Sequence, residues 1–522
     1  MAGGIEHAAA RAAVLQVWSD VLGTAVVPDD NFFRLGGTSL QAARVTAALR
    51  AATGHRVDMS AMFSNPVAAD LAELIPHLPR LKRDGRRART TRSSVSYQMD
   101  QRLRRDAIEA TRRTRRVVLA WDLTGPLDTD RLRAAITLVL KRHEVLRTKF
   151  TVDEGGVPRQ DVAATADLDF RVLDLRSAEA DLDAVLADFV AEPFNRVEAR
   201  LFRASLIRKN DEEWTFALAF DHIVFDAWSH RVLVEELSAH YESVTLPLPA
   251  QWRDFVAAQR QVVEGEEGQS LRAYWRDTFA NSSPISDYPL RHSGSDEPTA
   301  IMRSHELTGA ESDRAWELIR RSSTTSFVLA ATALNLLLDA ATGGGDHVIG
   351  TSVANRESPA FHGTIGWFAH GMPVRTRWTD GATVDQVLDT THKAVADALS
   401  HSALPWTEII RDCDPSEYLQ PPRKLTPYLN VQDDGAAPLV PRFSGVAVSP
   451  RAVVPTTSDP TFSVWVRTGP RWTVTVLADG AVFHEHAVSG LLTAYLACLG
   501  EVIDPRARSA DIRALLVLHE LI

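Results

Sequence analysis

The chain has 522 residues and a formal net charge of −10, and hydrophobic residues make up 45% of it against 24% charged residues. This composition excludes a disordered or collagen-like chain, and the length predicts about three folding units. No apolar run reaches the roughly 18 residues of a membrane helix, and residues 1–14 lack the pattern of a secretory signal. We therefore expect a cytoplasmic protein without a membrane partner.

Two features of the composition bear on metals and nucleic acids. The two cysteines, Cys413 and Cys498, do not belong to a C-x-x-C or similar ligand pattern, so we expect neither a disulfide framework nor a metal site. Residues 80–116 hold thirteen arginines and one lysine against four acidic residues. Such a run can bind RNA or a membrane, but a solvated linker followed by a charged helix face is the more ordinary interpretation. The net negative charge argues against nucleic-acid binding.

Residues 1–79 are predicted to form a small helical domain. Apolar residues recur at helical spacing over residues 5–22, a second helix is expected over 40–52, and a short helix follows Pro66. Residues 80–93 lack apolar periodicity and are rich in arginine, threonine and serine, so we interpret them as an interdomain linker.

From residue 94 to residue 522 the pattern predicts one large α/β region. Helical stretches such as 132–143 alternate with short strands such as 214–220. Because a region of this length is too long for one compact core, we expect two lobes, at about 94–270 and 271–522.

A pair of glycines precedes the second helix of the first domain. Gly36 and Gly37 allow a tight turn, after which Ser39 lies at the helix N-terminus. Free N–H groups and the helix dipole favour a phosphate at that end, so Ser39 is a candidate for a phosphodiester. An ordinary serine N-cap is the alternative that these residues leave open.

This part of the chain resembles the peptidyl carrier proteins of non-ribosomal peptide synthetases. The resemblance rests on D-x-F-F-x-L-G-G-x-S-L over residues 30–40 and M-F-x-x-P-V-A-x-x-L-A over residues 62–72. It implies a four-helix bundle with a covalent 4′-phosphopantetheine arm on Ser39, which a phosphopantetheinyl transferase would attach. Phe32 and Phe33 are expected to be core residues.

A histidine stands at the end of a predicted strand in the second region. Apolar side chains alternate over 214–220, and His222 follows where a rigid sheet can hold its imidazole in a cleft. Histidine transfers protons near neutral pH, and Asp226 can orient a neighbour through a charged hydrogen bond. The alternative for a single histidine at a strand end is a satisfied core or rim position.

The wider sequence resembles the condensation domains of the same synthetases over residues 94–520. The shared motifs are, in chain order, RHEVLRTKF at 142–150, DHIVFD at 221–226, WRDF at 252–255, YW at 274–275, IGTSVANR at 349–356, IGWF at 365–368 and, after His401, PW at 405–406. The resemblance implies a chloramphenicol-acetyltransferase-like fold, with two lobes in a V and an active-site tunnel between them. It also implies catalysis by His222 and an ion pair of Asp226 with Arg356.

The family signature is H-H-x-x-x-D-G, and this chain departs from it twice. Asp221 replaces the first histidine, and Ala227, which precedes Trp228, replaces the closing glycine. Asp221 is expected to point to the opposite face of the strand from His222, and Ala227 fits only where φ is not positive. His370 falls in a further stretch that departs from the family, and its sequence context assigns it no role.

These resemblances imply an enzyme that forms amide bonds between carrier-bound thioesters, in the biosynthesis of a peptide such as an antibiotic or siderophore. The donor would come from Ser39 and, before it, from upstream synthetase modules. The acceptor would come from a downstream aminoacyl carrier with its adenylation domain, which we expect beyond residue 522. No epimerase separates the two domains, so we expect an L-donor and an L-acceptor. Whether His222 acts as a base or positions the amine stays open.

Two other functions fit the departures from the signature. Condensation-like domains with degenerate signatures recruit tailoring oxygenases, and Asp221 with Ala227 is degeneracy of that kind. In ester-forming or cyclising variants, the cyclising signature has aspartate at the first position and again five residues on, which is the spacing of Asp221 and Asp226. Retention of His222 and Asp226 speaks against recruitment, and His222 with the intact motif at 142–150 favours amide-bond formation over the cyclising variant.

Overall fold

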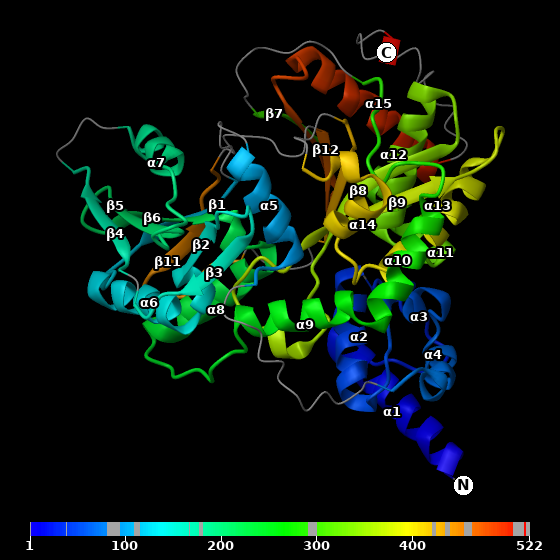
Figure 1. Ribbon diagram of the computed structural model, residues 1–522, viewed down its shortest axis with the longest axis horizontal. Helices are drawn as coiled ribbons and strands as arrows, with labels where there is room; N and C mark the ends of the chain where they lie inside the picture. Colours follow the sequence, from blue (N-terminus) through cyan, green and yellow to red (C-terminus); the bar gives the residue numbers. More distant parts are fainter. Residues whose placement is uncertain are drawn as a thin grey trace.

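The computed structural model describes residues 2–37, 39–80, 94–108, 115–165, 167–176, 181–290, 300–419, 424–433, 439–453, 462–504 and 516–517. The linker expected at 80–93 lies outside these ranges except for Arg80. The described chain forms a helical domain at the amino end and two larger α/β lobes that lie side by side (Figure 1). The helical domain, drawn in blue, lies below the second lobe in this view.

The described part of the amino-terminal domain is a bundle of four α-helices around an aromatic core. Its elements are α1 (Ala2–Leu22), α2 (Ser39–Thr53), α3 (Met59–Ser64), α4 (Ala68–Leu74) and the 3-10 turn η1 (Ile75–His77). Trp18, Phe32 and Phe33 are fully buried, and the rings of Trp18 and Phe32 meet edge to face with centroids 5.1 Å apart. The core positions expected for the two phenylalanines are confirmed.

A mixed five-stranded sheet in the order β11-β1-β6-β5-β4 organises the first lobe. Its strands are β1 (Arg116–Thr124), β4 (Asp169–Asp174), β5 (Phe202–Arg208), β6 (Glu213–Asp221) and β11 (Ala447–Pro450). A separate hairpin pairs β2 (Thr148–Val152) with β3 (Pro158–Val162). The helical elements are α5 (Tyr97–Ile108), α6 (Thr129–Arg142), η2 (Glu144–Arg147), α7 (Leu182–Ala191), η3 (His222–Val224), α8 (Ala227–Tyr241) and α9 (Trp252–Glu264).

The central strand β6 shows why both faces of this sheet are covered. Phe216 and Leu218 belong to the large core that α6 and α8 close, while Ala217 and Ala219 belong to a smaller core under α7. Successive side chains of a strand point to opposite faces, so the alternation of large residues and alanines fixes which helices pack on each side. The two faces expected from the sequence of this strand are confirmed.

The second lobe contains a six-stranded sheet in the order β7-β13-β12-β10-β8-β9. Its strands are β7 (Ala300–Glu306), β8 (Asp346–Val353), β9 (His370–Arg377), β10 (Tyr428–Asp433), β12 (Phe462–Thr468) and β13 (Thr473–Asp479). The helical elements are α10 (Glu266–Thr278), α11 (Gly309–Ser322), α12 (Ser326–Thr342), η4 (Pro359–Phe361), α13 (Val384–Ser400), α14 (Trp406–Cys413), η5 (Pro415–Glu417) and α15 (Glu485–Ile503).

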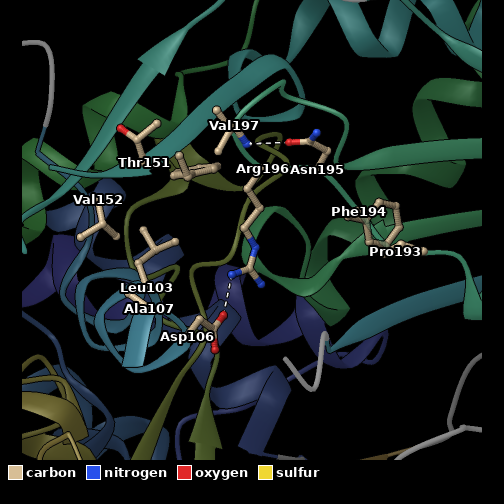
Figure 2. A pocket seen from close by; sticks show the side chains of 11 residues that line it. Leu103, Asp106, Ala107, Thr151, Val152, Pro193, Phe194, Asn195, Arg196 and Val197 are labelled. Atoms are coloured by element: carbon tan, nitrogen blue, oxygen red, sulfur yellow. Dashed lines mark hydrogen bonds and ion pairs between the residues drawn. The ribbon is translucent and has the colours of Figure 1, made fainter. Parts of the chain in front are cut away.

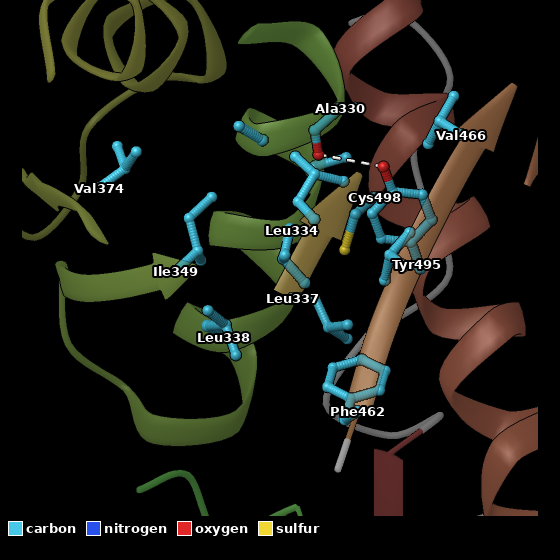
Figure 3. Packing of buried hydrophobic residues seen from close by; sticks show 14 of the residues in the cluster. Ala330, Leu334, Leu337, Leu338, Ile349, Val374, Phe462, Val466, Tyr495 and Cys498 are labelled. Carbon is cyan, nitrogen blue, oxygen red and sulfur yellow. Dashed lines mark hydrogen bonds between the residues drawn. The ribbon is translucent and has the colours of Figure 1, made fainter. Parts of the chain in front are cut away.

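Helices α12 and α15 pack together on this sheet (Figure 3). The Tyr495 hydroxyl donates to the Ala330 carbonyl at 3.0 Å, beside Leu334 and Cys498. By length and composition α15 could cross a membrane, although its apolar residues do not form one uninterrupted run. However, 61% of its apolar window is buried inside the protein, so its hydropathy is that of a core helix.

Among the described elements, β11 and α9 both connect the two lobes expected at about 94–270 and 271–522. Strand β11 comes late in the sequence but pairs antiparallel with β1, with Trp121 opposite Pro450. It belongs to the first sheet because β1 would otherwise present an unpaired edge there. Helix α9 also spans both lobes, since Phe255 packs in the first core and Val263 in the second.

Candidate active site and carrier site

Strand β6 leads directly into the signature residues. The strand ends at Asp221, the 3-10 turn η3 begins at His222, and α8 begins at Ala227. Asp226 caps α8 by accepting a hydrogen bond from the Ser229 N–H at 2.8 Å. Because Ala227 is the first residue of the helix and its φ is not positive, alanine is accommodated where the family has glycine.

The imidazole of His222 is half-buried at this corner. Its ring meets the indole of Trp367 edge to face, with centroids 5.3 Å apart. Its Nδ1 is buried and has no hydrogen-bond partner within the described parts of the chain. The pKa of His222 is lowered, first by removal from water and then by the charge of Arg115, against the opposing charges of Asp226 and Asp221. The ring is therefore neutral near pH 7.

Asp226 and Arg356 form the ion pair expected from the sequence. Arg356 Nη2 lies 3.1 Å from Asp226 Oδ1, and both side chains are almost fully buried. Asp226 Oδ2 also accepts from the backbone N–H groups of Phe368 and Ala369, while Arg356 Nη1 donates to the Thr364 carbonyl at 2.6 Å. The pair thus ties the corner between β6 and α8 to the loop at 356–369.

Trp228 has a structural position beside this pair. Its Nε1 donates to the His362 carbonyl at 3.0 Å, and its ring lies 5.8 Å from the guanidinium of Arg356. Together these contacts fix the loop that presents Trp367 to His222.

The two glycines before α2 are needed for different physical reasons. Gly36 has φ +90°, a conformation that side chains disfavour, and it is exposed. Gly37 lies against Phe32, where an added Cβ would meet the ring at 2.3 Å. Helix α2 begins at Ser39 itself, one residue earlier than expected. The exposed turn leaves room for a large group at the positive end of the helix, so the local geometry fits a phosphodiester arm.

Comparison with known proteins identifies both regions. Residues 116–515 match the family model for the condensation domain, and residues 12–75 match the model for a phosphopantetheine attachment site. The chain belongs to the condensation domain family. Its amino-terminal region is a carrier of covalent 4′-phosphopantetheine on a serine. The expected order, a helical carrier followed by a two-lobed condensation fold, is confirmed.

The similar proteins are much longer than this chain. Cyclosporin synthetase simA of Tolypocladium inflatum is 29% identical over 75% of the chain, which spans 3% of that protein. Phosphinothricin tripeptide synthetase PhsC of Streptomyces viridochromogenes is 31% identical over 58% of the chain, or 29% of that protein.

Solved structures show the same fold at lower identity. The X-domain in a complex with OxyB from teicoplanin biosynthesis has a TM-score of 0.70 and 22% identity, covering 80% of this chain and 95% of that one. The condensation domain from the monacolin K polyketide synthase MokA has a TM-score of 0.68 and 20% identity, covering 78% and 96%.

The structure adds contacts to the loop at 365–369 whose partners the sequence did not assign. His143 Nε2 lies 3.0 Å from Glu236 Oε2, and His143 Nδ1 accepts from the Ile365 N–H at 3.3 Å. Gln98 on α5 donates to the Trp367 carbonyl at 2.9 Å. These side chains hold the 365–369 loop of the condensation domain from two further helices. The family motif at 142–150 was a signal for His143, but no local pattern marks Glu236.

His370 begins β9 and is buried. Its Nδ1 lies 2.8 Å from the Gly371 carbonyl oxygen, and β9 pairs His370 with Val353. Burial lowers the pKa of His370. These contacts give it a place in the sheet of the second lobe rather than at His222.

The carrier is docked on the second lobe of the condensation domain. Helix α3 packs against α13, where Phe63 meets His392 edge to face and Ala396 joins the hydrophobic core of the carrier. Arg50 pairs with Glu357, Arg56 pairs with Glu267, and Asn31 and Arg34 both donate to the Ser323 hydroxyl. This contact places α2 beside the loop that follows Arg356.

Proposed function

We propose that this chain is a carrier and condensation pair of a non-ribosomal peptide synthetase. Ser39 bears the phosphopantetheine arm, and the condensation domain joins the donor acyl group to an aminoacyl group by an amide bond. The observation that carries the proposal is His222, a half-buried neutral imidazole at the end of β6, beside the buried ion pair of Asp226 and Arg356.

The arm supplies a thiol to which the donor is joined as a thioester. Attack of the acceptor amine on the carbonyl of that thioester would form a C–N bond and break the C–S bond, and the leaving thiolate would take up the proton that the amine loses. His222 accepts the proton that the amine loses; its lowered pKa makes it a weaker base but keeps it unprotonated at neutral pH. Asp226 and Arg356 hold the site in shape rather than exchange protons, because hydrogen bonds occupy both carboxylate oxygens.

The proposed partners follow from this reaction. A phosphopantetheinyl transferase modifies Ser39, upstream modules supply the donor, and a downstream carrier with its adenylation domain supplies the acceptor. We propose an L-donor and an L-acceptor. A reducing cytoplasm suits Cys413 and Cys498, which are both free thiols.

The test is a single-turnover assay with the full chain. Ser39 is loaded with an acyl-pantetheine, an aminoacyl carrier is added, and the amide product is measured by mass spectrometry. Ser39→Ala should abolish uptake of the pantetheine mass, and His222→Ala should slow product formation by at least about tenfold. Pantetheine on another residue, or an unchanged rate in His222→Ala, contradicts the assignment of that residue.

A second candidate function is recruitment of a partner enzyme. It is favoured by the structural likeness to the X-domain, which one solved structure holds in a complex with OxyB, and by Asp221 and Ala227. Tight binding of an oxygenase by a chain that forms no amide would favour this function. The cyclising alternative is weaker, because Asp221 and Asp226 are both engaged by buried arginines.

A further inference from the structure

Asp221 is held by an arginine that the signature does not include. Arg196, in the loop before β5, directs Nε to Asp221 Oδ2 at 2.6 Å and Nη2 to Asp221 Oδ1 at 3.2 Å. The side chain of Asp221 is 1% exposed and that of Arg196 is 11% exposed. This two-point contact fixes the plane of the carboxylate as well as its charge.

A second carboxylate completes the arrangement. Arg196 Nη1 lies 2.5 Å from Asp106 Oδ2 on α5, and Arg102, one turn earlier on the helix, also pairs with Asp106. Although burial opposes it, Asp221 and Asp106 raise the pKa of Arg196. Arg196 therefore stays charged between two carboxylates that belong to different elements, β6 and α5.

The held carboxylate acts directly on the turn that carries His222. Asp221 Oδ1 accepts a hydrogen bond from the Ile223 N–H at 3.1 Å, which caps the 3-10 turn beginning at His222. The hydrogen bonds of Asp221 go to Arg196 and to this turn, while the imidazole contacts Trp367. The carboxylate thus fixes the backbone of the turn that begins at His222, without contacting the imidazole ring.

The outer side of Arg196 borders a cavity of about 530 Å³ (Figure 2). Leu103, Phe150 and Phe194 line it together with Asp106. Figure 2 shows the arginine side chain extending to Asp106, with the ion pair drawn between them.

We propose that Arg196 and Asp106 are positioning residues for the condensation reaction, acting through Asp221 to hold the turn that presents His222. This inference rests on the proposed function of His222. It explains how the chain accommodates an aspartate at the first signature position. The negative charge of Asp221 is paired with the guanidinium of Arg196, whereas an unpaired buried carboxylate would be strongly destabilising.

The test combines kinetics with NMR titration of His222 in the full chain, labelled at histidine Cε1 and assigned with His222→Ala. The charged groups acting on the ring are Arg115, Asp221 and Asp226. Arg196→Met leaves Asp221 without its countercharge, so the pKa of His222 should rise. Asp221→Asn removes a negative charge near the ring, so the pKa should fall. A merely structural role does not predict opposite shifts.

Two more variants separate charge from geometry. Arg196→Lys keeps the charge but not the two-point contact, so the His222 pKa should stay near that of the parent chain while kcat falls about tenfold with little change in KM. Asp106→Asn should also lower kcat, by a smaller factor. This variant provides the kinetic test if Arg196→Met does not fold. Arg171→Met is the matched control, because Arg171 also bridges two carboxylates, Asp169 and Glu192, on another strand.

The proposal is overturned if folded Arg196→Met keeps both the kcat and the His222 pKa of the parent chain, or if Arg196→Met and Asp221→Asn shift the pKa in the same direction. If the parent chain forms no amide, the proposed function fails, but the titration still decides whether Arg196 and Asp221 control the state of His222.

Discussion

Arg50 on the carrier helix α2 donates a hydrogen bond from Nη1 to Oε2 of Glu357 at 2.9 Å, across the contact between carrier and condensation domain. Glu357 follows Arg356, whose guanidinium holds Asp226. The carrier therefore touches the loop beside the candidate active site, and its position bears on the order of that loop.

Charge reversal at this contact should loosen the docked carrier. Arg50→Glu places two negative charges together, and Arg50→Glu with Glu357→Arg restores the attraction in the opposite sense. Because Glu357 is half exposed, we expect an effect of about 1 kcal/mol or less, seen as faster hydrogen exchange over residues 357–362 in the single variant alone. Arg303→Glu breaks a distant pair with Glu485 and serves as control. Equal exchange in all variants would show that this pair does not hold the carrier.

Removing one partner of the buried Asp226–Arg356 pair should destabilise the condensation domain. Arg356→Met leaves a buried carboxylate without its countercharge, which costs about 3–5 kcal/mol of unfolding free energy. Asp226→Asn should cost a comparable amount, and the double variant should cost less than the sum because the two changes remove one interaction. Urea unfolding measures all three. Additive losses of less than about 1 kcal/mol each would show that the pair is not coupled.

The rate of amide formation should depend on the protonation of His222. In the proposed mechanism the neutral imidazole is the active form, and the pKa of His222 is lowered below its ordinary value of 6.5. The rate should therefore be retained as the pH falls through 6.5 and decline only at lower pH. His222→Ala should lack this decline in a pH–rate profile over the range where the fold is intact. A rate that halves at pH 6.5 or above would contradict the lowered pKa.

Acid should destabilise the second lobe through His347. This side chain is buried among aromatic rings, and burial lowers its pKa from 6.5 to about 4. The unfolded chain binds the proton more readily, so the contribution of this group is fully present above pH 6.5 and is lost as the pH falls from about 6.5 to about 4. The loss is up to about 3 kcal/mol.

His347→Phe removes the titrating group but keeps an aromatic ring, so unfolding free energy should vary less between pH 4 and 6.5. His484→Phe makes the same substitution at an exposed position and provides the control. An equal pH dependence in His347→Phe and the parent chain would exclude this histidine as the source.

Local patterns in the sequence were enough to predict several features of the fold and the site. The alternation over 214–220 predicted the two faces of β6, and the glycines before Ser39 marked the start of α2 within one residue. The family motifs added the pair of Asp226 and Arg356, which are far apart in sequence, and the order of carrier and condensation domain. These predictions succeeded because a strand, a helix start or a motif is determined by residues that are consecutive in the sequence.

Which distant side chains meet could be learned only from the packed chain. Asp221 gained Arg196 and, through it, Asp106; His143 reached Ile365; and β11 returned from the second half of the chain to pair with β1. The docking of α3 on α13 could not be predicted either, because no local sequence pattern in one helix identifies the other as its partner. Such contacts depend on how helices and sheets pack against each other, which brings a buried charge or an unpaired strand edge to its partner. The two partners lie far apart in the sequence, so no short stretch contains both of them.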